Sequence, residues 1–179
     1  MISIPPGGLR VDEIVIRLPT HADVAAIAPA FADPAVGGEA GLPPLDEAAL
    51  HVFIDEELEG LLASGTMVPL LLVDAETDEV LGGGAYHHVD SQRATVEIGY
   101  WLLPGARGRG VASRAVRALA KHAFAQKLRR IHAVVRVENS ASQRVLERAG
   151  FTREGVMRSY LPYAGEWRDA TLFSLLSDE

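Results

Sequence analysis

The sequence predicts a single α+β domain with a mixed, mostly antiparallel sheet, and three observations predict it. A chain of 179 residues with 48% apolar and 23% charged residues is long enough for one well-packed domain and short for two. Strand-like and helical patterns follow one another in the order β-α-α-β-β-β-α-β-α-β-β. Neither an internal repeat nor a linker divides the chain. We therefore expect residues 11–179 to form one domain and residues 1–10 to form a flexible tail.

The first half of the chain predicts a strand, two helices and a β-meander. Residues 11–18 are typical of a first strand, and Pro19-Thr20 ends it, with Thr20 as the N-cap of a helix that runs to Phe31. Residues 33–44 are rich in proline and glycine and predict a loop, whereas residues 46–62 predict a second helix. Strands follow at 68–73, 80–89 and 93–103. The second of these contains Gly82 to Gly84, which predict a bulge or the close approach of a backbone or ligand.

The second half predicts one right-handed β-α-β crossover followed by a terminal pair of strands. Apolar residues at three- and four-residue spacings predict a helix that begins at Val111, and a strand follows at 130–137. A helix at 140–149 ends at Gly150, which leads into a short strand. Residues 160–169 predict an aromatic loop, and residues 170–176 predict a strand that closes the sheet. About four helices are therefore expected to flank the sheet.

The net charge of −7 hides a strong asymmetry. Up to Leu103 the chain has 3 Lys and Arg against 17 Asp and Glu, and from Pro104 onward it has 14 against 7. This split indicates an anionic ligand on the C-terminal half and a cation facing the N-terminal half, although charges scattered over solvated faces would give the same numbers. The acidic balance, with no stripe of basic and aromatic residues, disfavours nucleic acid.

Several function classes are excluded by composition. The chain has no cysteine, which rules out disulfides, thiolate catalysis and cysteine-ligated metals, and we expect no metal. No apolar run approaches the ~20 residues of a membrane span, and the first residues lack the pattern of a secretory signal. We therefore expect a cytoplasmic protein that does not bind membranes, either a monomer or a homodimer.

The stretch from Glu97 to Ala112, EIGYWLLPGARGRGVA, organises the chain. A strand passes through a turn of glycine and arginine into a helix, and the amide groups and dipole of a helix N-terminus favour an anion. The turn has neither the GxxxxGK[ST] order nor GxGxxG, because Ser113 stands where the third glycine belongs. Taken alone, it is equally consistent with a basic turn that merely caps a helix.

A second stretch, from Glu138 to Phe151, makes the pattern specific. EIGYWL, then Arg107-x-x-Gly110-x-Ala112, then Asn139-x-x-Ser142 followed by Gly150-Phe151 resembles the GNAT superfamily of acyl-CoA-dependent N-acetyltransferases. Within it the chain is most similar to the RimJ/RimL type, which acetylates the N-termini of ribosomal proteins. The tail YLPYAGEWRDATLFSLL is also similar to that branch, so the resemblance extends from about residue 15 to 176.

The resemblance implies acetyl-CoA as the cofactor. The turn would hold its pyrophosphate, and a bulge near 100–103 would splay the strand at 93–103 from that at 130–137, so that the pantetheine arm pairs with the free strand edge. A free N–H at the bulge would polarise the thioester carbonyl. Helix capping is the alternative role for Asn139 and Ser142. The implied cofactor-binding residues are Trp101, Leu102, Leu103, Arg107, Gly108, Arg109, Gly110, Val111, Ala112, Asn139 and Ser142.

Two residues are candidates for catalysis. Glu97 is the candidate base that takes a proton from the amine through a water, although an ion pair with Arg93 or another arginine would also explain a carboxylate on this strand. His87 and His88 are weaker alternatives, and by alternation one of them points outward. Many members of the superfamily use a tyrosine as the acid, but Leu146 occupies its place here, so Ser142 is the candidate beside the departing sulfur.

The acceptor side follows less directly from the sequence. The second helix and the loop at 33–44 would form one wall of a groove, and the aromatic loop would form the other, where aromatics with acids suit an ammonium group. Packing under the last strand is the alternative for Trp167. We expect transfer to a protein N-terminal α-amine in a ternary complex, with a small amine or a non-catalytic acyl-CoA sensor as alternatives. The candidate substrate-binding residues are His87, Tyr100, Tyr160, Tyr163, Glu166 and Trp167.

Overall fold

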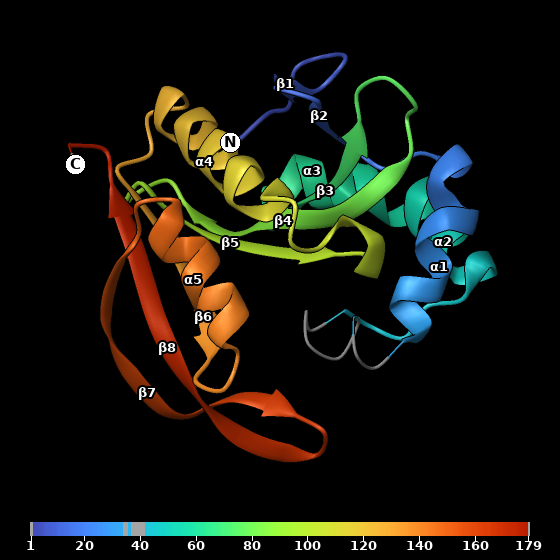
Figure 1. Ribbon diagram of the computed structural model, residues 1–179. Helices are drawn as coiled ribbons and strands as arrows, with labels where there is room; N and C mark the ends of the chain where they lie inside the picture. Colours follow the sequence, from blue (N-terminus) through green and yellow to red (C-terminus); the bar gives the residue numbers. More distant parts are fainter. Residues whose placement is uncertain (1, 34–35, 37–41, 179) are drawn as a thin grey trace.

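An eight-stranded sheet runs through the computed structural model, which describes residues 2–33, 36 and 42–178 (Figure 1). Its spatial order is β1-β2-β3-β4-β5-β6-β8-β7, and every neighbouring pair is antiparallel except β5 and β6. The strands are β1 Leu9–Val11, β2 Ile14–Arg17, β3 Met67–Asp74, β4 Val80–Asp90, β5 Thr95–Leu102, β6 Arg130–Arg136, β7 Thr152–Tyr163 and β8 Glu166–Leu176. The helices are α1 Val24–Ala32, α2 Glu47–Val52, α3 Leu58–Ser64, α4 Val111–Ala125 and α5 Ser140–Arg148. The predicted mixed, mostly antiparallel α+β architecture is confirmed.

The N-terminal segment differs from the prediction. Instead of one strand at 11–18, β1 and β2 form a hairpin in which Leu9 pairs with Ile16, and Asp12 adopts a φ of 48° at the turn. Residues 2–10, expected as a tail, contact the rest of the chain: Ile2 is buried, and the Ser3 carbonyl lies 2.8 Å from Nε2 of His122 on α4.

A buried carboxylate holds the start of α1. Arg17 donates two hydrogen bonds of 2.8 Å to Asp23, and the amide and hydroxyl of Thr20 donate two more at 2.7 and 2.8 Å. Burial raises the pKa of Asp23, but these donors outweigh burial and the pKa lies below its usual value. The predicted cap at Thr20 is therefore part of a larger network that ties β2 to α1.

The predicted helix at 46–62 is present with an interruption. Asp46 caps α2 by accepting from the Ala49 amide at 2.8 Å, a π-helical turn at Phe53–Glu57 joins α2 to α3, and Gly65 ends α3 with a φ of 69°. The predicted loop at 33–44 lies largely outside the described residues. No helix of the described part of the chain is long and apolar enough to cross a membrane.

The sheet splays open between β5 and β6. These two strands pair over only three positions, from Thr95 with Arg130 to Glu97 with His132, whereas β5 pairs with β4 without a register shift from Glu97 to Leu102. The predicted splay is confirmed. The predicted bulge near 100–103 is wrong, because the strands separate directly after Glu97 while the pairing of β5 with β4 continues in register.

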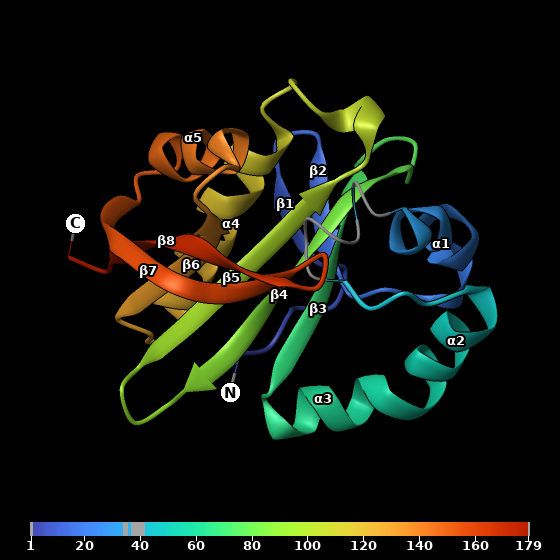
Figure 2. The ribbon, with the colours of Figure 1, turned by 90° about the horizontal axis from the view of Figure 1, so that it is seen from below.

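The helices lie on the two faces of the sheet, with α4 and α5 on one face and α1 and α2 on the other (Figure 2). On one face the buried Tyr86 hydroxyl donates to the Leu119 carbonyl at 2.7 Å and anchors α4 to β4. On the other face Trp101 meets Phe31 of α1 edge to face, with ring centroids 6.2 Å apart. The indole also covers Gly83, where a Cβ would lie 2.8 Å from the ring. The predicted close approach of a backbone is confirmed at Gly82 and Gly84, which lie against backbone atoms of β5, whereas the neighbour of Gly83 is a side chain.

Candidate active site

Alternate residues of β5 point to the two faces of the sheet. Ile98 pairs with Tyr86, so Ile98 and Tyr100 lie on the face of α4 and α5. Glu97, Gly99 and Trp101 lie on the face of α1. We call these the α4 face and the α1 face. The predicted site residues are therefore divided between two surfaces that meet at the edge of β5.

The free edge of β5 belongs to the even-numbered residues. The Leu103 amide donates to the Leu81 carbonyl at 3.0 Å, so the ladder directs the backbone groups of residues 97, 99 and 101 toward β4. Those of Ile98, Tyr100 and Leu102 point into the gap, and Nε of Arg107 indeed reaches the Leu102 carbonyl at 3.2 Å. Trp101 was among the residues predicted to contact the cofactor in the gap, but it does not face the gap. Its backbone pairs with β4 and its side chain is buried against α1.

The turn before α4 has the geometry of an anion cradle. Gly108 and Gly110 both have a φ of 75°, the left-handed region that favours glycine, and Gly110 is the N-cap of α4. The amide of Arg114 makes the first helical bond, to the Gly110 carbonyl at 3.2 Å. The earlier amides of α4, including those of Val111 and Ala112, therefore have no partner within the helix. With the side chains of Arg107 and Arg109 exposed, this turn fits a pyrophosphate.

Asn139, Ser142 and Tyr100 meet across the gap. Asn139 is the N-cap of α5, where its Oδ1 accepts from the Ser142 amide at 3.0 Å, so the capping alternative holds for this residue. Tyr100 lies on the α4 face, and its hydroxyl is 2.7 Å from Ser142 Oγ and 3.0 Å from the Ser142 carbonyl oxygen. Tyr100 was expected to bind substrate, but its side chain joins Ser142 instead. Leu146, at the place of the missing tyrosine, is fully buried.

Glu97 lies on the α1 face among three histidines. Its Oε2 is 3.2 Å from Nδ1 of His88 and 3.6 Å from Nε2 of His132. His88 reaches Glu97 because it has a φ of 50° in an irregular stretch of β4, which breaks the expected alternation with His87. Burial raises the pKa of Glu97, but the contacts with His132 and His88 outweigh it, and the pKa is lowered overall. The histidines, rather than an arginine, are its partners.

His87 and His132 complete this cluster in different ways. His87 pairs with Glu97 across the strands and lies over Gly99, and burial lowers its pKa, so its ring is neutral at pH 7. His132 was not predicted. Its position in the alternating strand RIHAVVR was visible in the sequence, but its place opposite Glu97 depends on the register of β5 with β6, which no local pattern carries.

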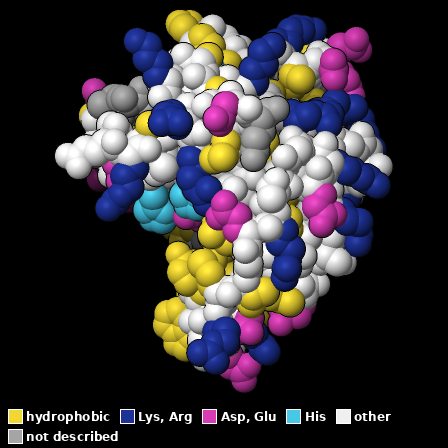
Figure 3. All heavy atoms as spheres, turned by 90° about the vertical axis from the view of Figure 1, so that its left-hand side faces the viewer, with side chains coloured by type: hydrophobic (Ala, Val, Ile, Leu, Met, Phe, Trp, Pro, Cys, Tyr) yellow, Lys and Arg dark blue, Asp and Glu magenta, His cyan; other side chains and the backbone are white. Residues whose placement is uncertain are grey.

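The predicted acceptor-binding residues of the terminal hairpin do not lie on one face of it. Tyr163 and Glu166 pair with each other beside the hairpin turn, and the guanidinium of Arg136 lies 3.8 Å above the Tyr163 ring. Trp167 pairs with Pro162 and points to the opposite face, where it is 67% exposed. Tyr160 is also exposed, in a bulge of β7. Trp167 therefore does not pack under the last strand. Hydrophobic side chains are visible on the lower part of the molecule in Figure 3.

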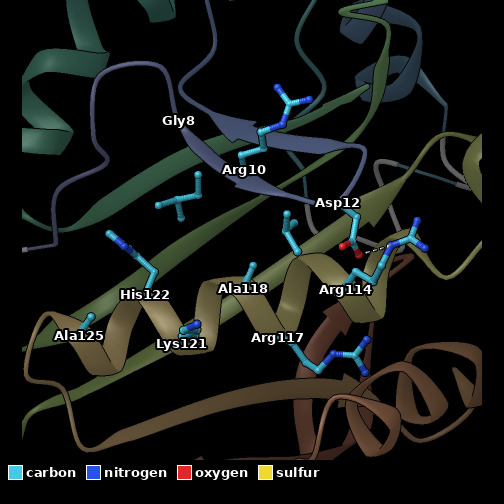
Figure 4. A pocket seen from close by; sticks show the side chains of 11 residues that line it. Gly8, Arg10, Asp12, Arg114, Arg117, Ala118, Lys121, His122 and Ala125 are labelled. Carbon is cyan, nitrogen blue, oxygen red and sulfur yellow. Dashed lines mark ion pairs between the residues drawn. The ribbon is translucent and has the colours of Figure 1, made fainter. Parts of the chain in front are cut away.

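A groove of about 600 Å³ lies on a different side of α4, between that helix and β1 (Figure 4). Arg10, Asp12 and Lys121 are among its lining residues, together with Arg114, which pairs with Asp12 and Glu13. None of the predicted site residues lines it. The groove is therefore separate from the gap between β5 and β6.

Comparisons with known proteins agree with this geometry. The model of the acetyltransferase (GNAT) domain matches residues 13–152. The chain belongs to the GNAT acetyltransferase family. An uncharacterized N-acetyltransferase p20 of Bacillus licheniformis is 29% identical over 172 residues, 96% of this chain and 97% of that protein. The ribosomal-protein-serine acetyltransferase of Escherichia coli is 34% identical over 103 residues, 56% of this chain and 57% of that protein.

Solved structures support the same family. The structure of Mycobacterium smegmatis RimJ in complex with CoA-disulfide is 27% identical, with a TM-score of 0.81 over 92% of this chain and 82% of that one. The expected GNAT N-acetyltransferase and its RimJ/RimL-like character are confirmed. This neighbour holds a form of coenzyme A, and acetyl-CoA is the cofactor expected from the sequence.

Proposed function

We propose that this GNAT enzyme transfers the acetyl group of acetyl-CoA to the α-amine of a protein N-terminus, by direct attack in a ternary complex. The observation that carries the proposal is the division of β5 at the gap: a free strand edge and an anion cradle on one side, and a carboxylate on the other. Both reactants can therefore reach the same strand edge from opposite faces. The name of the Escherichia coli relative, a ribosomal-protein-serine acetyltransferase, supports a ribosomal protein as the acceptor.

The α4 face provides the binding groups for acetyl-CoA. The first amides of α4 and the turn from Arg107 to Gly110 hold the pyrophosphate, and the edge groups of Ile98, Tyr100 and Leu102 pair with the pantetheine arm. Acetyl-CoA, when bound, supplies an acetyl group on a thioester that an amine can attack. An edge amide of β5 donates a hydrogen bond to the thioester oxygen, where negative charge develops.

The α1 face provides the base. The lowered pKa of Glu97 keeps its carboxylate ionised at neutral pH, and the carboxylate accepts the proton of the attacking amine through a water. His88 and His132 lie beside the carboxylate and hold it in place. Ser142 stands on the α4 face, beside the departing sulfur.

The acceptor approaches over the α1 face between the first helices and the terminal hairpin. In the described residues, α1 and α3 contact β4 and β3, and α1 also reaches β5 through Phe31 and Trp101, whereas alternate side chains of β6 are partly exposed. A polypeptide end can therefore enter from that side. Tyr163 and Glu166 are placed to meet an ammonium group or a peptide at the hairpin.

The test is thiol release from acetyl-CoA with matched acceptors. A peptide with a free N-terminal serine or alanine should support release, while the same peptide with a blocked N-terminus and an internal lysine should not. Polyamines and free amino acids form the third arm. Faster turnover with a small amine would replace the proposed acceptor class, and acetyl-CoA binding without release in any arm would identify a non-catalytic sensor.

A further inference from the structure

The hydrogen bond between Tyr100 and Ser142 crosses the gap in the sheet. Tyr100 comes from β5 and Ser142 from the first turn of α5, so the two residues stand on the two walls of the gap. The hydroxyl oxygens are 2.7 Å apart, the usual distance for an O–H···O hydrogen bond. The same Ser142 is fixed through its amide by Asn139, which leaves its hydroxyl as the adjustable part.

The Tyr100 hydroxyl keeps its hydrogen near neutral pH and can therefore donate to Ser142. Burial raises the pKa of its phenol, and the hydrogen bond with Ser142 only partly offsets this rise, so the phenol stays protonated. Its single hydrogen has two acceptors, Ser142 Oγ and the Ser142 carbonyl oxygen. When it goes to Oγ, the Ser142 hydroxyl hydrogen is free to point elsewhere and is a stronger donor, because hydrogen bonds in a chain polarise one another.

We infer that Tyr100 is a positioning residue that directs the Ser142 hydroxyl toward the departing sulfur of acetyl-CoA. The inference rests on the proposed function. In the transfer the C–N bond forms, the C–S bond breaks, and the sulfur leaves with the bonding electrons. Ser142 Oγ–H stabilises that thiolate by a hydrogen bond. The amine gives one proton to Glu97, which passes it to solvent, and the thiolate takes one proton from solvent.

The position of the bond along β5 supports this role. The anion cradle follows the C-terminal end of β5, so an arm that runs from the cradle along the free edge passes Leu102 before it reaches Tyr100 and Ile98. Glu97 stands one residue further, on the α1 face. Tyr100 and Ser142 are therefore at the level of the strand where the arm ends and the amine arrives.

The decisive measurement is the pKa of the thiol of bound coenzyme A, followed by the ultraviolet absorbance of the thiolate in a pH titration. Wild type should lower this pKa below that of free coenzyme A. Tyr100→Phe should raise the bound thiol's pKa by about one unit relative to wild type, since one hydrogen bond to a charged group contributes about 1.4 kcal/mol or more. Ser142→Ala should do the same, and the double variant should match either single one.

Kinetics provide the second measurement. Tyr100→Phe should lower kcat about tenfold with little change in the KM for acetyl-CoA, and it should have no further effect in the Ser142→Ala background. Ser140→Ala is the matched control, because Ser140 is an exposed serine of the same turn with no bond to Tyr100. It should leave both the thiol pKa and kcat unchanged.

Two results would overturn the inference: an unchanged thiol pKa in Tyr100→Phe, or an equal loss of kcat with and without Ser142. If Tyr100→Phe does not fold, 3-fluorotyrosine can replace Tyr100, because its hydroxyl is a stronger donor. This replacement should lower the thiol pKa only when Ser142 is present, and an unchanged thiol pKa would also reject the inference. The titration needs no acceptor, so it succeeds or fails independently of the acceptor panel. Failure of coenzyme A to bind would reject both proposals.

Discussion

The two faces of β5 differ in the chemistry that they present at the gap. On the α4 face the polar groups include several donors: backbone amides, the Tyr100 hydroxyl and two exposed arginines. On the α1 face they are a carboxylate and the histidines that hold it. One strand thus separates a surface that offers donors from a surface that carries a carboxylate, and the two meet at the gap after Glu97.

The difference shows how one strand can serve a two-substrate reaction. Strand alternation alone sends neighbouring residues to opposite faces, so Glu97 and the edge groups of Ile98 lie close together without sharing a surface. An anion held on one side does not have to approach the carboxylate on the other. The basic half of the sequence supplies α4 and its turn, and the acidic half supplies Glu97.

The largest expected effect is on the α4 face, at Gly110. Gly110→Asp places a side chain on a residue with a φ of 75° and a negative charge at the N-terminus of α4, where the anion would lie. We expect acetyl-CoA binding to be lost in calorimetry, with an affinity at least ~100-fold weaker, the factor that corresponds to about 3 kcal/mol. The thermal midpoint of the chain should change little.

Gly105→Asp is the matched control for this variant. It adds the same charge to the same loop at a residue without a positive φ and without a neighbour within 4 Å. It should weaken binding far less. Retained affinity in Gly110→Asp would show that the turn before α4 does not bind the anion. The proposed contrast between the two faces would then fail.

The α4 face was largely predictable because its signals are local. A strand, a turn with Gly108 and Gly110, and a helix with no acid in its first turn are contiguous in the sequence, and backbone geometry follows from them. The splay was also expected, although its cause was misplaced: a bulge was predicted, and the structure has a short parallel pairing instead. A parallel register is set by packing between distant segments, and no residue near 100–103 encodes it.

The second effect tests the α1 face. Glu97→Gln keeps the shape of the side chain but cannot accept a proton, so kcat should fall by roughly 10²-fold, the size of general-base catalysis, while acetyl-CoA affinity stays unchanged. Steady-state kinetics with calorimetry separates the two quantities. Glu147→Gln is the control, because Glu147 is an exposed acid near the C-terminal end of α5, on the opposite face of the sheet from Glu97. Equal losses in both variants would deny Glu97 a special role.

The α1 face was harder to predict because its contacts are long-range. His132 meets Glu97 only through the pairing of β5 with β6, and His88 reaches it only because an irregular stretch of β4 breaks alternation. Tyr100 was assigned to the acceptor, yet its partner Ser142 is 42 residues away and comes from α5. The hairpin residues were grouped by sequence, whereas the register of β7 with β8 sends Tyr163 and Trp167 to opposite faces.

The smallest effect separates those two aromatic residues. Tyr163 lies under the Arg136 guanidinium and pairs with Glu166, whereas Trp167 is exposed on the other side of the hairpin. If the acceptor uses the α1 face, Tyr163→Ala should raise the KM for a peptide acceptor by about fivefold, since a cation–π or aromatic contact contributes about 1 kcal/mol. Trp167→Ala should leave that KM and the free energy of unfolding almost unchanged. The opposite ranking in steady-state assays would place the acceptor on the α4 face, beside the cofactor, and the two faces would no longer divide the substrates.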